Sequence, residues 1–447
     1  MNIAHGRKMR REGSVFILVL WISFGLVVLS LYFANSMSFE LKAADNRLAL
    51  KQADHAINGA ARYASYVITT FATNGVVPDV QLYRSEYVPV GEASFWLLGE
   101  LNEEQLRSEM IPAFGLVDEA SKLNLNTATV EMLQGLPGMT AEFAAAIVDW
   151  RDTNAELSEN GAEDESYQRL NPPRRCKNAP FESVDELRLV YGATIEVLYG
   201  EDSNRNGILD LNENDGDVSL PLDNADGRIE PGIVSYLTVH SRQLNTNPDG
   251  SAKVNVTNRQ QVEDLLEEKF GSERATQIMG SLGPGGQFNS LLQFYARSGM
   301  NVEEFAQVEA ELTVSTQNAV QGLVNVNTAS EVVLSCIPGI GEAKAATMVA
   351  HRTSNPAQLT SVAWVKDVLD TDTINQAGRF LTGTTYQFTA DVVAVGRFNR
   401  GFRRTRFVFD ATGSAPRIVY RQDLSELGWA LGMQVRENLQ REMESRL

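Results

Sequence analysis

The stretch RREGSVFILVLWISFGLVVLSLYFANS, from Arg10 to Ser36, decides how this 447-residue chain is organised. Its run from Val15 to Ala34 has no charged residue and follows several basic side chains. An α-helix rises about 1.5 Å per residue, so roughly 20 such residues span the hydrocarbon core of a bilayer. A secretory signal has a shorter apolar region, of about 7 to 15 residues, so cleavage between Ala34 and Ser36 is the less favoured alternative. The sequence predicts a transmembrane helix over 14–36, with its basic end in the cytoplasm.

The residues after this span continue a helical pattern. From Glu40 to Phe71 there is no proline, and apolar residues such as Leu48, Ala56 and Ala60 recur at helical spacing. We therefore expect the same helix to extend over 37–75 and to pack on a domain outside the membrane.

Composition limits the classes of partner. The formal net charge is −18 and 43% of the residues are hydrophobic, which favours a packed core and an acidic surface that repels nucleic acid. Cys176 and Cys336 are the two cysteines of the chain. They could form a disulfide or remain two buried thiols, and the sequence favours the thiols.

Strand patterns occur in two separate regions. Short apolar alternations over 76–122 and again over 380–423 predict β-strands, with a hairpin turn at Asn399 to Gly401. The last segment, 424–447, places leucines on one face of an amphipathic helix. The long region between the two strand regions is predicted to be mostly helical.

A repeated phrase lies inside that region. LNLNTATVEMLQGLPGMTAEFAAAIVDWR begins at Leu123, and VNVNTASEVVLSCIPGIGEAKAATMVAHR begins at Val324 without a gap in the alignment. Thr328 and Glu331 fit a capping box for the helix that follows. Each copy predicts a helix-hairpin-helix, one within 123–253 and one within 323–375, with turns at Pro137, Gly138, Pro338, Gly339 and Gly341.

A fainter third start, VNVTNRQQVEDLLEEKFG, begins at Val254. It opens a middle helical segment over 254–322, of which the part over 258–321 has no clear place in the pattern.

A helix-hairpin-helix can bind DNA phosphates through the N–H groups of its glycine turn. The copy at Val324 keeps IPGIG, with Lys344 and Arg352 nearby, whereas the copy at Leu123 reads LPGMT and is followed by acidic residues. Phosphate affinity requires several basic side chains at once. We therefore favour a packing role for both hairpins over DNA binding.

The segment DSNRNGILDLNE, from Asp202 to Glu213, has the spacing of a calcium-binding loop. Gly207 stands at the sharp turn, and the residues after Glu213 are too rich in glycine, proline and aspartate for the exiting helix of an EF-hand. We expect a weak, structural Ca²⁺ site. Its predicted ligands are Asp202, Asn204, Asn206, Ile208 through its carbonyl, Asp210 and Glu213.

We find no catalytic motif in the sequence. The four histidines are scattered, and the carboxylates form no pair that suggests acid–base chemistry. We therefore expect a protein that is not an enzyme.

Together these motifs resemble a known family. A basic leader over 1–13 that ends in Gly13 looks like a prepilin-type signal, which prepilin peptidase would cut to leave Ser14 as the first residue. The phrases SKLNLNTAT, AIVDWRD, GAEDESY, PFESVDELRLVYG and YLTVHS occur in the order seen in the minor pseudopilin K of type II secretion, general secretion pathway protein K.

The resemblance implies an α+β, pilin-like fold, in which the N-terminal helix lies on an antiparallel sheet that carries a large helical insertion with bound calcium. It implies processing and methylation of the N-terminus, a single pass through the bacterial inner membrane, and a bulk in the periplasm. It also implies a place at the pseudopilus tip with the minor pseudopilins I and J, where the protein helps to start assembly. Pilin-like proteins usually carry glutamate at position 5 of the mature chain, where this chain has Leu18. The rival hypothesis is a membrane-anchored DNA receptor of the competence type.

Overall fold

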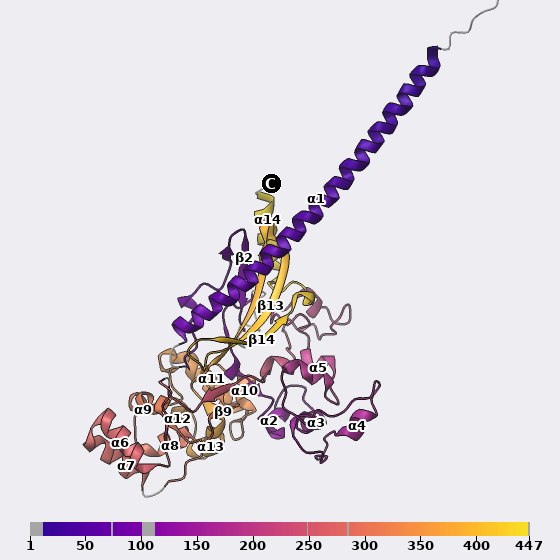
Figure 1. Cartoon of the computed structure of the whole chain (residues 1–447). Helices are drawn as coiled ribbons and strands as arrows, with labels where there is room; N and C mark the ends of the chain where they lie inside the picture. Colours follow the sequence, from indigo (N-terminus) through magenta and orange to yellow (C-terminus); the bar gives the residue numbers. More distant parts are fainter. Residues whose placement is uncertain (1–11, 73–74, 101–111, 248, 284–285, 446–447) are drawn as a thin grey trace, which may run out of the picture.

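The computed structural model describes residues 12–72, 75–100, 112–247, 249–283 and 286–445 (Figure 1). Side chains at 12–14 and 445 are outside this description. Helix α1 runs without interruption from Glu12 to Phe71. Its N-terminal half projects away from the body, and its C-terminal half lies on the sheet (Figure 1). The predicted continuous helix is therefore confirmed, although it ends at Phe71 and not at residue 75.

The sheet is antiparallel and combines the two predicted strand regions. Its order is β1-β2-β12-β13-β14, and β3 pairs with β12. The strands span Val88–Val90 (β1), Ala93–Leu98 (β2), Val117–Asp118 (β3), Gln387–Gly396 (β12), Arg400–Asp410 (β13) and Arg417–Asp423 (β14). The turn between β12 and β13 spans Arg397–Asn399, with Phe398 and Asn399 at positive φ. The predicted turn at Asn399 to Gly401 was therefore two residues too late, because β13 already begins at Arg400.

Helix α1 approaches the sheet closely because both surfaces carry small residues. Ala53, Ala56 and Ala60 are completely buried on one face of the helix. A Cβ on Gly396 would lie 2.1 Å from the carbonyl oxygen of Ala49, and one on Gly401 would lie 2.5 Å from its carbonyl carbon. The crossing of α1 over the β12–β13 hairpin therefore requires glycine at both positions.

The opposite face of the sheet is covered by the C-terminal segment. Trp96, Val393 and Val395 pack there against Leu431 and Leu439. Helix α14 begins at Gly432 and ends at Ser445, so the prediction of a helix from residue 424 was wrong at its start. The turn at Ser425–Leu427 and Gly428, at φ 88°, interrupt that pattern.

The region between β3 and β12 contains three structural repeats. Each repeat opens with a two-residue strand and closes with a Leu-Thr strand that pairs with it in parallel. The first repeat runs from Leu123 to Thr238, the second from Val254 to Thr313, and the third from Val324 to Thr382. The paired strands are Leu123–Asn124 (β4) with Leu237–Thr238 (β5), Val254–Asn255 (β7) with Leu312–Thr313 (β8), and Val324–Asn325 (β10) with Leu381–Thr382 (β11).

Helices fill each repeat. In the first these are α2 (Val130–Gln134), α3 (Ala141–Arg151), α4 (Asp164–Gln168) and α5 (Ile195–Tyr199). In the second they are α6 (Arg259–Phe270), α7 (Ser272–Leu282), α8 (Leu291–Ser298) and α9 (Val302–Val308). In the third they are α10 (Glu331–Ser335), α11 (Gly341–Ser354), α12 (Val365–Val368) and α13 (Thr371–Ala377). Strands β6 (Arg242–Leu244) and β9 (Ala319–Gln321) pair between the repeats.

The same polar contacts build all three repeats. The side-chain oxygens of Asn124, Asn255 and Asn325 each accept a hydrogen bond from the backbone N–H two residues later. The hydroxyls of Thr238, Thr313 and Thr382 do the same at the closing strand. Most of the segment over 258–321, which the sequence pattern had left without a place, is therefore the body of a second repeat that closes at Thr313. The remainder leads into β9.

The capping of the third repeat differs from the prediction. Ser330 caps α10 by accepting from the N–H of Val333 at 3.2 Å, so the expected capping box at Thr328 was wrong. Thr328 instead donates its hydroxyl to Asp118 Oδ2 at 2.6 Å, because the turn after Asn325 directs it toward the sheet.

Candidate functional site

The predicted calcium-binding residues lie in one compact loop beside the sheet. Asp202, Asn206 and Glu213 are buried, and Gly207 has φ 72°, as its place at the sharp turn requires. Both carboxylate oxygens of Asp202 accept backbone hydrogen bonds, from the N–H of Asn206 at 3.0 Å and from that of Gly207 at 2.9 Å. Ile208 is also buried, and its N–H donates to Asn206 Oδ1 at 2.7 Å.

Three carboxylates crowd this loop. Burial raises the pKa of Glu213 to about 7, and the negative charges of Asp202 and Asp210 contribute to the rise. Burial also raises the pKa of Asp202. The raised pKa values mean that burial makes the anionic forms of Asp202 and Glu213 costly, and a bound cation would relieve that cost.

The loop's own donors engage the oxygens that a metal would need. Asn204 and Asn206 donate their side-chain N–H groups to Asp210 Oδ2 at 2.6 and 3.0 Å, and Ser203 donates to Glu213 Oε1 at 3.0 Å. In the described part of the chain, no three His, Cys, Asp or Glu side chains converge on a metal position. The spacing, turn and burial fit Ca²⁺, provided that the two Asn side chains turn to present oxygen.

A buried ion pair attaches this loop to the sheet. Arg404 of β13 is completely buried and donates from Nε and Nη2 to both carboxylate oxygens of Asp391, at 2.9 and 2.8 Å. Its guanidinium also donates to the carbonyl oxygens of Asn204 and Arg205, each at 2.6 Å. Sequence reasoning missed this pair. Asp391 is the one charged residue of β12, but β13 carries several arginines, so the sequence does not indicate which of them is the partner.

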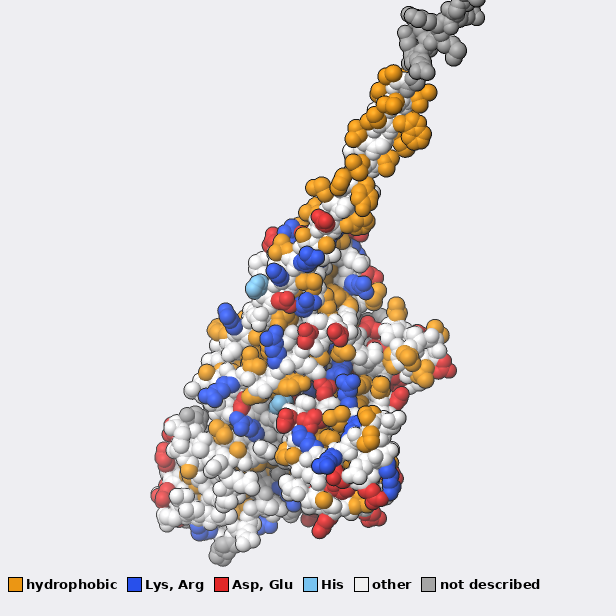
Figure 2. All heavy atoms as spheres, turned by 45° about the vertical axis from the view of Figure 1, so that its right-hand side comes forward, with side chains coloured by type: hydrophobic (Ala, Val, Ile, Leu, Met, Phe, Trp, Pro, Cys, Tyr) orange, Lys and Arg blue, Asp and Glu red, His pale blue; other side chains and the backbone are white. Residues whose placement is uncertain are grey.

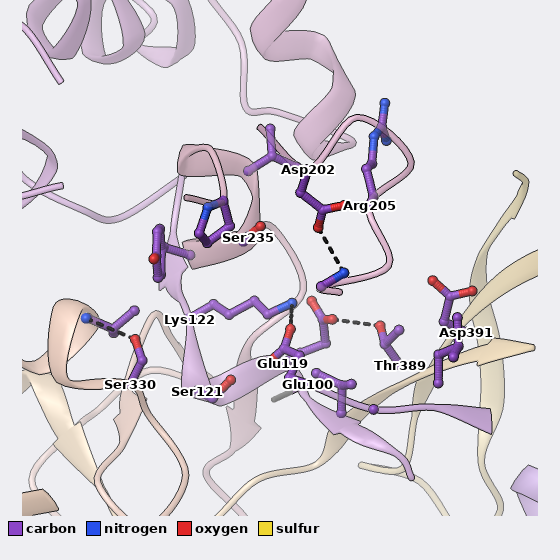
Figure 3. Close-up of a pocket in the computed structure, with 18 of the residues that line it drawn as sticks. Glu100, Glu119, Ser121, Lys122, Asp202, Arg205, Ser235, Ser330, Thr389 and Asp391 are labelled. Carbon is purple, nitrogen blue, oxygen red and sulfur yellow. Dashed lines mark hydrogen bonds and ion pairs between the residues drawn. The ribbon is translucent and has the colours of Figure 1, made fainter. Parts of the chain in front are cut away.

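A cavity of about 430 Å³ opens beside the loop, between the sheet, the first repeat and the third repeat. Figure 3 shows Lys122 extended toward Glu100, and the two groups form an ion pair at 2.6 Å. Glu119 in the same wall accepts a hydrogen bond from Thr389 at 2.6 Å. The charges that line this cavity are therefore largely compensated by one another.

The predicted hairpin turns are present in two different settings. Pro137 and Gly138 are exposed in the first repeat, where Thr140 caps α3 in place of the missing glycine. In the third repeat, Gly339 and Gly341 have φ 87° and 66°. A Cβ on Gly339 would lie 2.9 Å from Gln376 Oε1, so this turn packs on α13. Pro338, which precedes it, is half-buried.

Basic residues of the hairpins serve internal contacts. Lys344 forms an ion pair with Asp370 at 3.1 Å and donates to the carbonyl oxygen of Gly339 at 3.3 Å. Arg352 donates to the carbonyls of Val326 and Ala329. Arg151, the matching residue of the first repeat, donates to the carbonyls of Leu125 and Ala128. These cations therefore stabilise the repeats themselves.

The predicted processing residues lie at the start of α1. Gly13 and Ser14 belong to its first turn, but their side chains and residues 1–11 are outside the described part. From Val15 the helix is long and apolar enough to cross a membrane. Figure 2 shows this part covered by hydrophobic side chains, whereas the body carries both signs of charge. Leu18 is 60% exposed there.

These features define a class: a protein whose long N-terminal helix begins with an apolar span that could cross a membrane and then packs on an antiparallel sheet with helix-hairpin-helix repeats. Residues 119–199 match the family model described as type II secretion system (T2SS), protein K, and residues 319–382 match that of the helix-hairpin-helix motif. These matches confirm the resemblance to the type II secretion protein K family and the hairpin in the third repeat.

Individual relatives match over different lengths. The type II secretion system protein K of Klebsiella pneumoniae is 38% identical over 66 residues, which cover 15% of this chain and 20% of the relative. The chain thus aligns with about a fifth of that relative's length. A chain in the crystal structure of the GspK-GspI-GspJ complex from enterotoxigenic Escherichia coli is 12% identical, with a TM-score of 0.42 over 83% of this chain and 96% of the other.

Proposed function

We propose that this protein is a minor pseudopilin of type II secretion, located at the tip of the pseudopilus, where it helps to initiate assembly. The observation that best supports this proposal is that one half of α1 is apolar and exposed, whereas the other half packs on the sheet. Such a helix can leave the bilayer and enter a bundle of similar helices, because its apolar face remains available. The role is structural, with no chemical step.

The apolar span of α1 and the basic residues before it also indicate the proposed location in the cell. The basic leader would remain in the cytoplasm, α1 would cross the inner membrane once, and the sheet and repeats would lie in the periplasm. Prepilin peptidase would cut between Gly13 and Ser14 at the cytoplasmic end. The proposed partners are the minor pseudopilins I and J, because the complex named for one structural neighbour contains proteins of those names.

Two features support the tip position. The mature chain would carry Leu18 where pilin-like proteins usually have glutamate, and an unpaired carboxylate in an apolar bundle is costly. A subunit with no neighbour ahead of it therefore gains by omitting that charge. The repeats, inserted between β3 and β12, also give the body a bulk that would obstruct another subunit above it.

We also propose that the loop from Asp202 to Glu213 binds one Ca²⁺. Asp202, Asn204, Asn206, Asp210 and Glu213 would supply side-chain oxygens, and Ile208 its carbonyl. The ion would neutralise the crowded carboxylates and stiffen the loop that Arg404 holds against the sheet.

The DNA-receptor alternative is not favoured. The turn with the intact glycine motif packs on α13, and Lys344 and Arg352 are engaged inside the third repeat. Binding of duplex DNA requires several available cations near one turn. Micromolar, salt-sensitive DNA affinity that is lost on changing Gly339 and Gly341 would favour the receptor function instead.

The deciding experiment is reconstitution of the complex. The full chain, purified in detergent, is mixed with minor pseudopilins I and J, and the mixture is separated by size-exclusion chromatography. We expect one complex that contains all three proteins, and a deletion strain that recovers secretion only with the full chain. Separate elution of the three proteins, together with normal secretion by the deletion strain, would refute the proposed function.

A further inference from the structure

The first repeat carries a loop that exposes apolar side chains to solvent. Four large hydrophobic residues of this loop are each between 62% and 84% exposed: Leu211, Val218, Leu220 and Leu222. By contrast, the described residues from 223 to 397 include no exposed large hydrophobic side chain, although they contain the second and third repeats. Exposed apolar patches on a folded surface mark sites of contact with another molecule. This apolar loop, residues 211–222, is therefore a candidate docking surface.

The apolar loop has a defined shape although its hydrophobic side chains are exposed. The carboxylate of Asp215 accepts hydrogen bonds from the N–H and the hydroxyl of Ser219, at 3.1 and 2.7 Å. The carboxylate of Asp223 accepts from the N–H groups of Asp215 and Gly216, at 3.0 and 2.9 Å. A loop that is already held in one conformation loses little conformational entropy when it binds. These hydrogen bonds therefore prepare the loop for docking.

Acidic residues accompany these apolar side chains. Residues 210–230 include seven carboxylates and one basic side chain, Arg228. The carboxylates belong to Asp210, Glu213, Asp215, Asp217, Asp223, Asp226 and Glu230. An anionic phospholipid surface would repel this charge. A protein surface with an apolar groove and with lysine or arginine at its rim would complement it.

The apolar loop lies at one side of the body. In Figure 1 it extends to the right of the sheet, above α5, and it is not in line with α1. Figure 2 shows hydrophobic side chains on a projection at the right of the body. Neighbouring bodies in a bundle of parallel α1 helices lie beside one another. A projection at the side of one body therefore points toward the next body of the bundle.

We propose that the apolar loop is the surface through which this protein binds the body of a neighbouring minor pseudopilin. This inference rests on the proposed function and adds to it the part of this chain that makes the contact. Val218, Leu220 and Leu222 enter an apolar groove of the neighbour, and their burial supplies most of the affinity. The exposed carboxylates of Asp217 and Asp226 face basic residues at the rim and accelerate association.

The test measures the affinity of the full chain, in detergent, for minor pseudopilins I and J by microscale thermophoresis. The loop variant combines Leu220→Ser with Leu222→Ser. The matched control combines Leu157→Ser with Leu189→Ser, because these leucines belong to the same repeat, are 64% and 45% exposed, and lie outside the apolar loop. We expect the loop variant to bind at least about tenfold more weakly than the wild type, and the control to stay within about twofold of it.

A second variant tests the charges. Asp217→Asn with Asp226→Asn should slow association and reduce its dependence on salt, because fewer charges remain to be screened. All the changed side chains are exposed, so near-UV circular dichroism of each variant should match that of the wild type.

Photo-crosslinking identifies what the apolar loop touches. A photo-reactive benzoylphenylalanine takes the place of Leu220 in vesicles that contain the full chain with minor pseudopilins I and J. We expect a crosslink to one of these two proteins, and none when the same group replaces Leu157. A crosslink to phospholipid instead would mean that the loop contacts the membrane, and it would overturn the inference.

The affinities separate this inference from the proposed function. A wild-type complex with I and J that is matched in affinity by the loop variant would overturn the inference and leave the proposed function intact. A wild-type chain that forms no complex with I and J would refute the proposed function, and this inference with it.

Discussion

Gly135 and Cys336 are in direct contact, and they occupy equivalent positions of the first and third repeats. A Cβ on Gly135 would lie 2.9 Å from Cys336 Sγ and 3.2 Å from its Cα. When a position in one copy meets the same position in the other, the two copies are related by an approximate two-fold axis. Only one of the two residues can carry a side chain there. Both cysteines are free, as the sequence favoured, but only Cys336 is buried, and Cys176 is half-buried.

Gly135→Val should lower the free energy of unfolding by about 1–3 kcal/mol, because overpacking forces the backbones of the two repeats apart. Thermal unfolding followed by circular dichroism measures the effect. The control is Gly280→Ala in α7, where nothing lies within 4 Å of an added Cβ and no loss is expected. A Gly135→Val variant as stable as the wild type would disprove the close contact.

Asp391→Asn should destabilise the protein by about 3–5 kcal/mol, because it leaves the buried Arg404 guanidinium without its counter-charge. Denaturant unfolding gives the difference. Asp372→Asn in α13, an exposed position, serves as the comparison and should change stability by less than about 0.5 kcal/mol. Equal losses in the two variants would contradict a special role for the pair.

The free energy of unfolding should also fall at low pH, because protonation of Asp391 removes its ion pairs. Burial alone would raise the pKa of this carboxyl, but Arg404 and Arg406 overcome it and hold the pKa far below its usual range. Because the pKa of the folded state is lower than that of the unfolded state, about 3.9, the carboxylate contributes its full stabilisation at pH values above the unfolded pKa. This contribution is lost as the pH falls from the unfolded pKa toward the folded pKa. The free energies of unfolding of the wild type and of Asp391→Asn are measured over a chosen pH series from about 6 to about 2, which spans the unfolded pKa. They should converge at the acid end of the series. Parallel curves would be evidence against this linkage.

Chelation of calcium should lower the melting temperature, and Asp202→Asn with Glu213→Gln should remove most of that response. The physical reason is that a ligand bound only to the folded state stabilises it by mass action, about 1.4 kcal/mol at ten times Kd. Differential scanning calorimetry with and without Ca²⁺ measures the shift. Asp217→Asn, an exposed carboxylate just beyond the loop, should leave the response intact. An unchanged calcium response in the double variant would exclude this loop as its source.

Gly13→Ala should block processing of the N-terminus in cells that contain prepilin peptidase. The peptidase must accommodate the residue before the cut, and an added Cβ there obstructs it. N-terminal sequencing of the wild type should begin at Ser14, and that of the variant upstream of it. Gly25→Ala lies within the span, where nothing approaches an added Cβ, and should be processed normally. A wild-type chain that begins near Ser36 would show an ordinary signal instead.

Much of the fold could be predicted because its signals are local. The charge-free span, the helical spacing after it, the alternation in the strand regions and the repeated phrase at Leu123 and Val324 each depend on near neighbours in the chain. The second repeat was harder to recognise. It keeps the Val-Asn and Leu-Thr strands, but its hairpin connects α6 and α7 through Gly271 alone, without a Pro-Gly turn.

The candidate sites also differ in whether their residues are close together in the sequence. The spacing of Asp202, Gly207 and Glu213 could be recognised in the sequence because a calcium loop takes its ligands from one short segment. Asp391 and Arg404 come from adjacent strands, and the carbonyls that Arg404 binds lie about 200 residues away in the chain. No sequence pattern records such a contact.

The sequence by itself determined the elements: a membrane helix that continues into water, two strand regions, and hairpins with glycine turns, because periodicity and turn chemistry act within a few residues. The resemblance implied one sheet with a large insertion, but only the tertiary structure decided the order and register of its strands across the 268 residues from 119 to 386, since strand pairing depends on distant partners. It also decided that Gly135 meets Cys336. Burial and contact are properties of the packed chain, and they exist only once its distant segments have come together.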